Sequence, residues 1–262
     1  MTGVRRSQRR LAPRPRARAL VLAVRWMDYP PPLRMLAAAE RSHAEQLPPW
    51  RARQWITGRL TARAALLLYL RGLPADLEIL PGPDGAPVLT GAGTAAHVLS
   101  ISHCDEWTAC ACGPAGHALG VDVEEAGACD DALLARVSGP GETRDGPATA
   151  THGWARKEAA FKACRGVPPV LTRYRLAGPA RVIASGGPVP GGTARADREL
   201  ATWTANLPGA VLAAAGTDPR PPLLRLLDAE TAVAMMAGNQ RTPNDSAAAT
   251  PERQPSSWNP QP

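Results

Sequence analysis

Apolar side chains alternate with smaller or polar ones just after residue 18, and this period of two predicts a strand over Ala19–Trp26. A helix is expected around Pro32–Gln46. The segment Trp50–Leu70 is a stronger helix candidate, because its apolar residues fall near one stripe and Gly72 follows as a stop signal. A turn-rich stretch at residues 81–87 comes next. Three further strands are then expected, at Val98–Ser102, Trp107–Cys112 and Ala118–Glu124.

The second half of the chain repeats the order of a helix followed by strands. A helix is expected near His152–Cys164, and each half contains a strand of small residues, at residues 107–113 and 210–215. Four strands are expected after this helix, at Thr172–Leu176, Arg181–Ala184, Ala201–Asn206 and Ala210–Ala215. The repeated order predicts an α+β fold of two similar lobes.

The two ends of the chain differ in composition from the lobes between them. Residues 1–18 contain seven arginines and no acid, and the sequence beyond residue 227 has little apolar periodicity. We therefore expect a disordered basic arm at 1–18, lobes at 19–115 and 116–227, and a disordered tail at 228–262. The arm has three open interpretations: a solvated tail, an arm that binds anions, or sequence added by a start codon placed upstream of Met27.

Charge and composition limit the function classes. The net charge of +7 resembles that of a nucleic-acid-binding protein, but the arm accounts for the whole excess, so a nucleic-acid partner is disfavoured. No apolar run is long enough to cross a membrane, and the start lacks the apolar core of a signal peptide. The five cysteines form no CxxC pair, zinc-site spacing or disulfide framework. These features predict a soluble, cytoplasmic protein with no membrane partner.

Candidate chemistry first occurs in the strand expected at residues 118–124. Positions two apart in a strand face the same way, so Asp122 and Glu124 project together while Val121 and Val123 face the core. Two adjacent carboxylates suit a hard divalent cation such as Mg²⁺, which keeps positions open for phosphate oxygens. The alternative is the wet face of a half-buried strand, which is the commoner origin of an Asp-x-Glu pattern.

Lysine is rare in this chain and confined to one place. Of the 30 lysines and arginines only two are lysines, Lys157 and Lys162, and the single phenylalanine, Phe161, lies between them. On a helix, Glu158 and Lys162 are one turn apart, which an ordinary surface ion pair would also explain. Because the chain uses arginine for every other basic position, the pattern indicates that both sites require a compact ammonium.

A third candidate segment, Ser100–Cys104, combines the end of a strand with a turn. It contains Ser102 and His103. A lone histidine in such a place is commonly structural, but beside two acids and two lysines it could bind a phosphate. A Ser-His-Asp hydrolase is a further alternative, although no Gly-x-Ser-x-Gly elbow supports it.

Taken together, these segments resemble the phosphopantetheinyl transferases, specifically the larger single-chain surfactin/enterobactin type. The resemblance lies in Ser-Ile-Ser-His-Cys at 100–104, Gly-Val-Asp-Val-Glu at 120–124 and Trp-Ala-Arg-Lys-Glu-Ala-Ala-Phe-Lys at 154–162, in the order found in that family. Upstream, residues 58–66 resemble its arginine helix, and Gly85-Ala86-Pro87 resembles its turn before the histidine strand. The resemblance implies two lobes related by pseudo-twofold symmetry.

By this resemblance, three acids hold Mg²⁺: Asp122, Glu124 and Glu158. Phosphates of coenzyme A are contacted by Ser102, His103, Lys157 and Lys162, and its 3′-phosphate and adenine end by Arg51, Arg59 and Arg63. The implied reaction transfers 4′-phosphopantetheine from coenzyme A to a serine of an acyl or peptidyl carrier protein, with release of 3′,5′-ADP. Glu158 is the implied general base, and Lys162 the group that stabilises developing charge. A monomer serving polyketide, nonribosomal peptide or siderophore biosynthesis is expected.

The sequence departs from the family at two places, and two rival functions stay open. Ala86 stands where the family often has a basic residue, and the segment 125–153 is short. A non-catalytic protein that binds coenzyme A or a carrier is therefore one rival. The other is a Mg²⁺-dependent nuclease, which the four-residue spacing of Glu158 and Lys162 and the uncharged body disfavour.

Overall fold

Strand β1 (Leu20–Arg25) lies inside its sheet and is buried on both faces. Leu22 and Val24 belong to a core beneath helices, whereas Val21 and Ala23 belong to a second core that also contains residues of the other large sheet. Both faces are therefore apolar, which explains why the strand carries almost no polar residue. The computed structural model describes residues 18–142, 149–165, 170–186 and 196–240.

The described chain forms two large sheets and one hairpin. The first sheet has the order β11-β1-β5-β4, with β11 (Leu223–Asp228) parallel to β1 and antiparallel pairing to β5 (Trp107–Pro114) and on to β4 (His97–His103). The second sheet is antiparallel, in the order β6 (Leu119–Glu125), β10 (Ala210–Gly216), β9 (Arg198–Leu207), β8 (Arg181–Ala184) and β7 (Tyr174–Leu176). The hairpin pairs β2 (Glu78–Pro81) with β3 (Pro87–Thr90).

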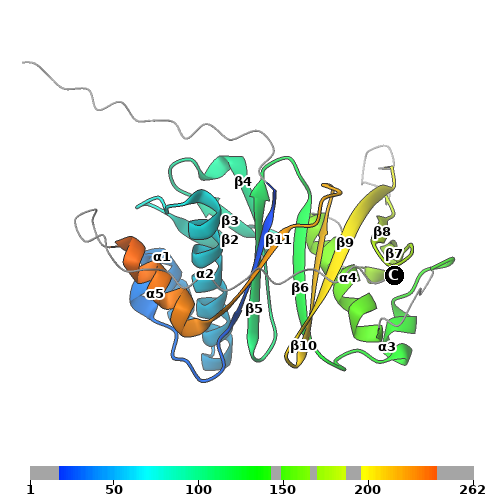
Figure 1. Cartoon of the computed structure of the whole chain (residues 1–262), viewed down its shortest axis with the longest axis horizontal. Helices are drawn as coiled ribbons and strands as arrows, with labels where there is room; N and C mark the ends of the chain where they lie inside the picture. Colours follow the sequence, from blue (N-terminus) through cyan, green and yellow to red (C-terminus); the bar gives the residue numbers. More distant parts are fainter. Residues whose placement is uncertain (1–17, 143–148, 166–169, 187–195, 241–262) are drawn as a thin grey trace, which may run out of the picture.

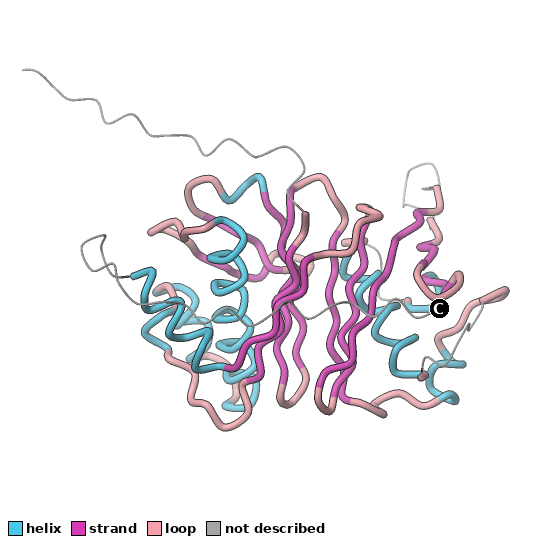
Figure 2. The backbone as a smooth tube through the Cα atoms, viewed as in Figure 1, coloured by secondary structure: helices cyan, strands magenta, loops and turns pink. Residues whose placement is uncertain are grey.

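The two large sheets form the middle layers of the molecule, and helices lie on the outer side of each (Figure 1). The helices beside the first sheet are α1 (Ala38–Glu45), α2 (Pro49–Leu70) and α5 (Ala229–Gln240). Those beside the second sheet are α3 (Asp131–Arg136) and α4 (Ala150–Ala163). Figure 2 shows the same sequence of layers, with the helices in cyan and the strands in magenta. Three short 3-10 helices complete the described elements, at Leu33–Met35, Thr94–Ala96 and Leu171–Arg173.

The α+β class predicted from the sequence is confirmed, and the expected strands and the two long helices are present with shifted ends. The helix expected around Pro32–Gln46 is shorter and is preceded by a 3-10 turn. The turn-rich stretch before β4 closes the hairpin of β2 and β3, where Gly85 adopts a φ of 77° that favours glycine. Among the described residues no helix is long and apolar enough to cross a membrane.

The tail was predicted to begin too early. The residues after 228 form α5, in which Ala232 and Met236 are buried in the core shared with α2. Strand β11, which precedes α5, pairs with β1, so the end of the described chain completes the first sheet. Most residues of α5 itself are small or apolar, on its exposed side as well as its buried side. The helical period of apolar positions that reveals a helix in a sequence is therefore weak here. The rest of the expected tail, from 241, and the expected arm at 1–17 lie outside the described residues.

Candidate active site

Strand β6 presents two acids to helix α4. Val121 and Val123 lie in the core between the sheets, so the alternate positions, Asp122 and Glu124, face the other way. The indole nitrogen of Trp154 on α4 donates to Oε1 of Glu124 at 3.2 Å. Both carboxylates therefore lie on the face expected from the period of the strand, and α4 covers them.

Gly120 allows this close approach of strand and helix. A Cβ atom at this position would lie 2.0 Å from the carbonyl oxygen of Ala159, which is closer than atoms can come. Any other residue would push α4 away from β6. The glycine that precedes the two acids in the sequence is thus explained by the packing that brings Glu158 and Lys162 to them.

Three elements meet at Asp122. The ammonium of Lys162, on α4, donates to Oδ1 of Asp122 at 2.5 Å and to Oγ of Ser102 at 2.9 Å. Ser102, near the end of β4, donates its own hydroxyl proton to the same carboxylate oxygen at 2.8 Å. Ser102 and Asp122 are both buried, whereas the side chain of Lys162 is 27% exposed. Of these three side chains, only that of Lys162 is appreciably exposed to solvent.

The acids in this cluster repel one another. Burial and the neighbouring charge of Asp122 raise the pKa of Glu124 to about 7, although the Trp154 hydrogen bond and Lys162 act in the opposite direction. Burial and Asp122 also raise the pKa of Glu158, against the effect of Lys162. A single lysine thus does not balance three carboxylates, and the cluster favours a further cation.

The donor set fits a divalent cation such as Mg²⁺. Oδ2 of Asp122 is buried and has no hydrogen-bond partner, which is costly for a carboxylate oxygen unless something else binds it. Carboxylate oxygens are the ligands that this ion prefers. Within the described ranges, however, no three His, Cys, Asp or Glu side chains are already arranged closely enough to hold a metal. The chemistry of the donors supports the expected metal site. The arrangement in which all three carboxylates bind one ion stays a prediction.

His103 is the last residue of β4, next to Ser102, which binds Asp122. Burial and the positive charges of Arg51 and Lys162 lower the pKa of His103 to about 4, while Asp122 acts in the opposite direction. The imidazole is therefore neutral at physiological pH and can offer a phosphate one N–H donor but no positive charge. Arg51, Lys162 and Asp122 are the charged groups with the largest effects on this imidazole.

The three arginines expected at the nucleotide have different surroundings. Arg51 is exposed and donates to Oε1 of Gln54 at 3.2 Å. Arg59 is 8% exposed and donates through Nε to the carbonyl oxygen of Ile79 at 3.1 Å. Burial lowers the pKa of Arg59 to about 10, so it remains charged. Arg59 is two residues from Thr57, whose hydroxyl accepts from Thr108, the strand partner of His103, so this part of α2 lies beside the end of β4.

Arg63 is bound elsewhere. It forms a 2.8 Å ion pair with Glu40, which is fully buried, and donates to the carbonyl oxygen of Leu77 at 2.8 Å. Glu40 in turn accepts from the backbone nitrogen of Ile79 at 2.7 Å. This buried pair fastens α2 to α1 and β2. The structure thus gives Arg63 a role in the fold, which does not support the expected contact with the nucleotide.

Lys157 is also bound inside the protein. It is fully buried, and its ammonium donates to Glu142 at 2.8 Å and to the carbonyl oxygens of Val137 and Tyr174 at 2.9 and 2.7 Å. These acceptors belong to three segments around α4. These partners of the rare lysine are protein atoms, so the expected phosphate contact is not supported.

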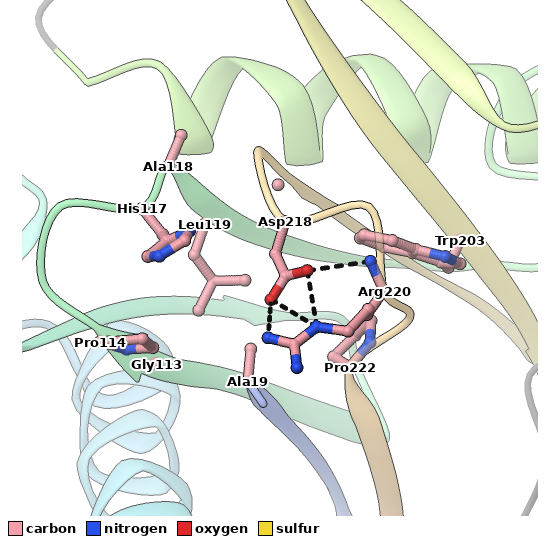
Figure 3. Close-up of a pocket in the computed structure, with 11 residues that line it drawn as sticks. Ala19, Gly113, Pro114, His117, Ala118, Leu119, Trp203, Asp218, Arg220 and Pro222 are labelled. Carbon is pink, nitrogen blue, oxygen red and sulfur yellow. Dashed lines mark hydrogen bonds and ion pairs between the residues drawn. The ribbon is translucent and has the colours of Figure 1, made fainter. Parts of the chain in front are cut away.

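A separate cavity lies at another end of the sheets (Figure 3). Asp218 and Arg220 at its mouth bind each other, and this pair holds the pKa of Asp218 down to about 2. None of the expected site residues lines it. The lining residues are Ala19, Gly113, Pro114, His117, Ala118, Leu119, Trp203, Gly216, Asp218, Arg220 and Pro222.

Two residues that matter to the site were not among the expected site residues. Trp154 binds Glu124, and its position one turn before Glu158 was a usable signal. Trp55 packs against Arg59, with the guanidinium carbon 3.3 Å from the ring centroid. The four-residue spacing of Trp55 and Arg59 on a helix was the signal for this contact.

The site thus combines clustered acids, an ammonium, a neutral imidazole and two arginines, which suits a phosphorylated anion bound together with a metal ion. Over 113 residues, the chain is 36% identical to a protein named 4′-phosphopantetheinyl transferase Svp, from Streptomyces mobaraensis. The match covers 42% of this chain and 43% of that protein, so the chain matches less than half the length of this relative. No family model matches the chain. The match supports a place in the phosphopantetheinyl transferase superfamily.

Proposed function

We propose that this chain is a 4′-phosphopantetheinyl transferase of the surfactin/enterobactin type. It moves the phosphopantetheine arm of coenzyme A to a serine of an acyl or peptidyl carrier protein and releases 3′,5′-ADP. The proposal includes a cytoplasmic monomer, with two lobes divided near residue 115 and related by pseudo-twofold symmetry. The supporting match to a named transferase is partial, so the activity and both partners belong to the proposal.

The observation that carries the proposal is the network of Lys162, Asp122 and Ser102, with Glu124 and Glu158 close enough to perturb each other. The residues come from β4, β6 and α4, which lie far apart in sequence. A surface ion pair would not need a buried carboxylate with one unpartnered oxygen. The arrangement is better suited to a charged ligand that brings its own cation.

Each polar group then has a role in binding coenzyme A. Arg51 and Arg59 would bind the 3′-phosphate, because a guanidinium matches a phosphate with two parallel hydrogen bonds. Ser102 and the neutral His103 would contact the pyrophosphate beside Lys162. Asp122, Glu124 and Glu158 would hold Mg²⁺, which supplies electrostatic stabilisation to the oxygens of the pyrophosphate when it is bound.

Glu158 is the proposed general base. The serine Oγ of the carrier attacks the phosphorus on the pantetheine side, and its proton passes to the carboxylate of Glu158, directly or through a water. The bond between that phosphorus and the bridging oxygen breaks, and 3′,5′-ADP leaves with the electron pair. Before a cation binds, burial and the charge of Asp122 raise the pKa of Glu158 above that of an exposed glutamate.

Lys162 is the proposed stabiliser of the transition state. Its ammonium is partly exposed and fixed by Asp122 and Ser102, so it need not reorganise when negative charge develops on the oxygens of the pyrophosphate. The same ammonium can bind the bridging oxygen as the bond to it breaks. Its position on the open side of the network suits both tasks.

The test is direct transfer. The full chain is incubated with coenzyme A, Mg²⁺ and a panel of apo carrier proteins, and the carriers are weighed by mass spectrometry. A gain equal to one phosphopantetheine on the carrier serine, absent with a serine-to-alanine carrier, supports the proposal. Binding of coenzyme A without transfer to any carrier would instead favour the non-catalytic binding protein.

A further inference from the structure

The guanidinium of Arg59 is fixed on two sides. Its Cζ lies 3.3 Å from the centroid of the Trp55 ring, and its Nε donates to the carbonyl oxygen of Ile79 at 3.1 Å. The stacking sets the plane of the group, and the hydrogen bond sets its rotation within that plane. Within the described residues neither terminal nitrogen of Arg59 donates to a protein acceptor. A nearly buried charge thus keeps unused donors in a defined orientation.

Trp55 is itself held in place. Its indole nitrogen donates to the carbonyl oxygen of Glu40 at 3.2 Å, and its ring stacks on the imidazole of His43, with centroids 4.0 Å apart and planes 33° apart. Glu40 is fully buried and accepts from the backbone of Ala37 and Ile79. The stack is therefore anchored to α1 rather than free to move with solvent.

Arg63, one turn further along α2, provides the contrast. Its Nε and one terminal nitrogen bind Glu40, and the same terminal nitrogen donates to the carbonyl oxygen of Leu77. Arg63 thus uses its donors to hold the fold together, whereas Arg59 keeps both terminal nitrogens for a ligand. Thr57, two residues before Arg59, accepts a 3.2 Å hydrogen bond from Thr108, which is the strand partner of His103, so this part of α2 lies beside the candidate site.

We propose that Trp55 is a positioning residue that orients Arg59 toward the terminal phosphomonoester of the nucleotide, so that the chain prefers coenzyme A to dephospho-coenzyme A. The inference rests on the proposed function, since it takes coenzyme A as the substrate. A lysine or an unstacked arginine could supply the charge, but only a fixed plane can present two parallel donors to one phosphate. Specificity for the 3′-phosphate then depends on an aromatic ring that does not touch it.

Titration calorimetry on the full chain tests this role. The dissociation constants for coenzyme A and for dephospho-coenzyme A are measured for the wild type, Trp55→Leu and Trp55→Met. The ratio of the two dissociation constants measures the contribution of the 3′-phosphate to binding, because general damage to the fold weakens the binding of both ligands equally. Trp50→Leu is the matched control, since Trp50 lies at the start of the same helix and is 66% exposed. Thermal melts show which variants are folded, and either folded Trp55 variant decides the question.

We expect the wild type to bind coenzyme A more tightly than dephospho-coenzyme A. In the Trp55 variants the ratio of the two dissociation constants should fall about fivefold, the size of a partly buried cation–π contact. Trp50→Leu should keep the ratio of the wild type. A wild type with the preference, and Trp55 variants that retain all of it, would overturn the role of Trp55 while leaving the proposed function intact. Equal binding of both ligands by the wild type would overturn it too. A wild type that binds neither ligand would contradict the proposed function itself.

Discussion

The ammonium of Lys162 lies 2.5 Å from Oδ1 of Asp122, across 40 positions of sequence and between a helix and a strand. This contact joins the two segments that were singled out separately in the sequence, the acidic strand and the lysine helix. It depends on Gly120, because a side chain there would separate α4 from β6. The same close packing leaves Oδ2 of Asp122 buried without a partner. A hydrogen-bond donor or a coordinated metal ion at Oδ2 would remove the cost of this unpartnered oxygen.

Asp122→Asn should abolish transfer while leaving the fold intact. The amide keeps the shape of the side chain but removes the charge that attracts a cation, and we expect at least about a 100-fold loss in kcat/KM. Thermal stability should not fall much, because the charge of Asp122 also raises the pKa of Glu124 and Glu158 by repulsion. Asp218→Asn is the matched control, since that aspartate pairs with Arg220 outside the site. Near-wild-type turnover of Asp122→Asn at saturating Mg²⁺ would show that the metal assignment is wrong.

Lys157→Met should lower the stability of the protein rather than affect catalysis directly. The change removes the ammonium that pairs with the carboxylate of Glu142, whose side chain is 3% exposed. Breaking one side of a buried pair lowers the free energy of unfolding by about 3 kcal/mol. Adding Glu142→Gln removes the stranded charge and should restore part of the loss, as measured by urea denaturation. If Lys157→Met instead kept its denaturation midpoint and bound coenzyme A more weakly, Lys157 would contact a phosphate of coenzyme A, as the sequence predicted.

His152 should make a contribution to stability that is lost in mild acid. Its Nε2 lies 2.9 Å from the side-chain oxygen of Asn206, and burial lowers its pKa below the ordinary 6.5. The unfolded chain then binds a proton more readily than the folded one, so this contribution is complete above pH 6.5 and is lost as the pH falls. His152→Gln should reduce the pH slope of the unfolding free energy by up to about 1.4 kcal/mol per pH unit. Identical slopes for both proteins would exclude His152.

Truncation should separate α5 from the tail that follows it. Residues 18–240 contain all the described elements and should fold and transfer. A chain that stops at residue 228 loses the buried side chains of Val233 and Met236, at a cost of about 3 kcal/mol or more. Thermal melts of the two proteins measure the difference. Equal melting temperatures would mean that α5 contributes nothing to the core it covers.

The sequence pattern predicted the two long helices and most strands, including β1 and β10, although both of these strands are buried on both faces. It missed α5 because buried and exposed positions there differ little in polarity, and it missed β11 because its pairing with β1 is set by contacts more than 200 positions apart in the chain. The positions of Asp122 and Glu124 followed from the strand period alone. The partners of the basic residues did not, because a sequence does not show which carboxylate or carbonyl lies opposite a side chain.

Two basic residues show that limit most clearly. Rarity singled out Lys157, but its ammonium donates to protein atoms, namely Glu142 and the carbonyl oxygens of Val137 and Tyr174. Arg156, which was not among the candidate site residues, is 5% exposed and donates to Thr202 and to the carbonyl oxygens of Gly178 and Arg181. Arg156→Lys is therefore a test of stability and cannot serve as a silent control.

Lys162→Arg should be poorly tolerated although the charge is kept. The ammonium lies between Oδ1 of Asp122 and Oγ of Ser102, at 2.5 and 2.9 Å, and a wider planar guanidinium does not fit this space. Arginine would also pair with two carboxylate oxygens at once and draw Asp122 or Glu158 away from the metal. We expect the transfer rate to fall at least about tenfold, equivalent to 1.4 kcal/mol of transition-state stabilisation, with a smaller effect on the melting temperature. Arg136→Lys, an exposed position on α3, is the conservative control and should be silent. If Lys162→Arg turned over as fast as the parent, charge alone would suffice here, and the geometric case for lysine at this position would fail.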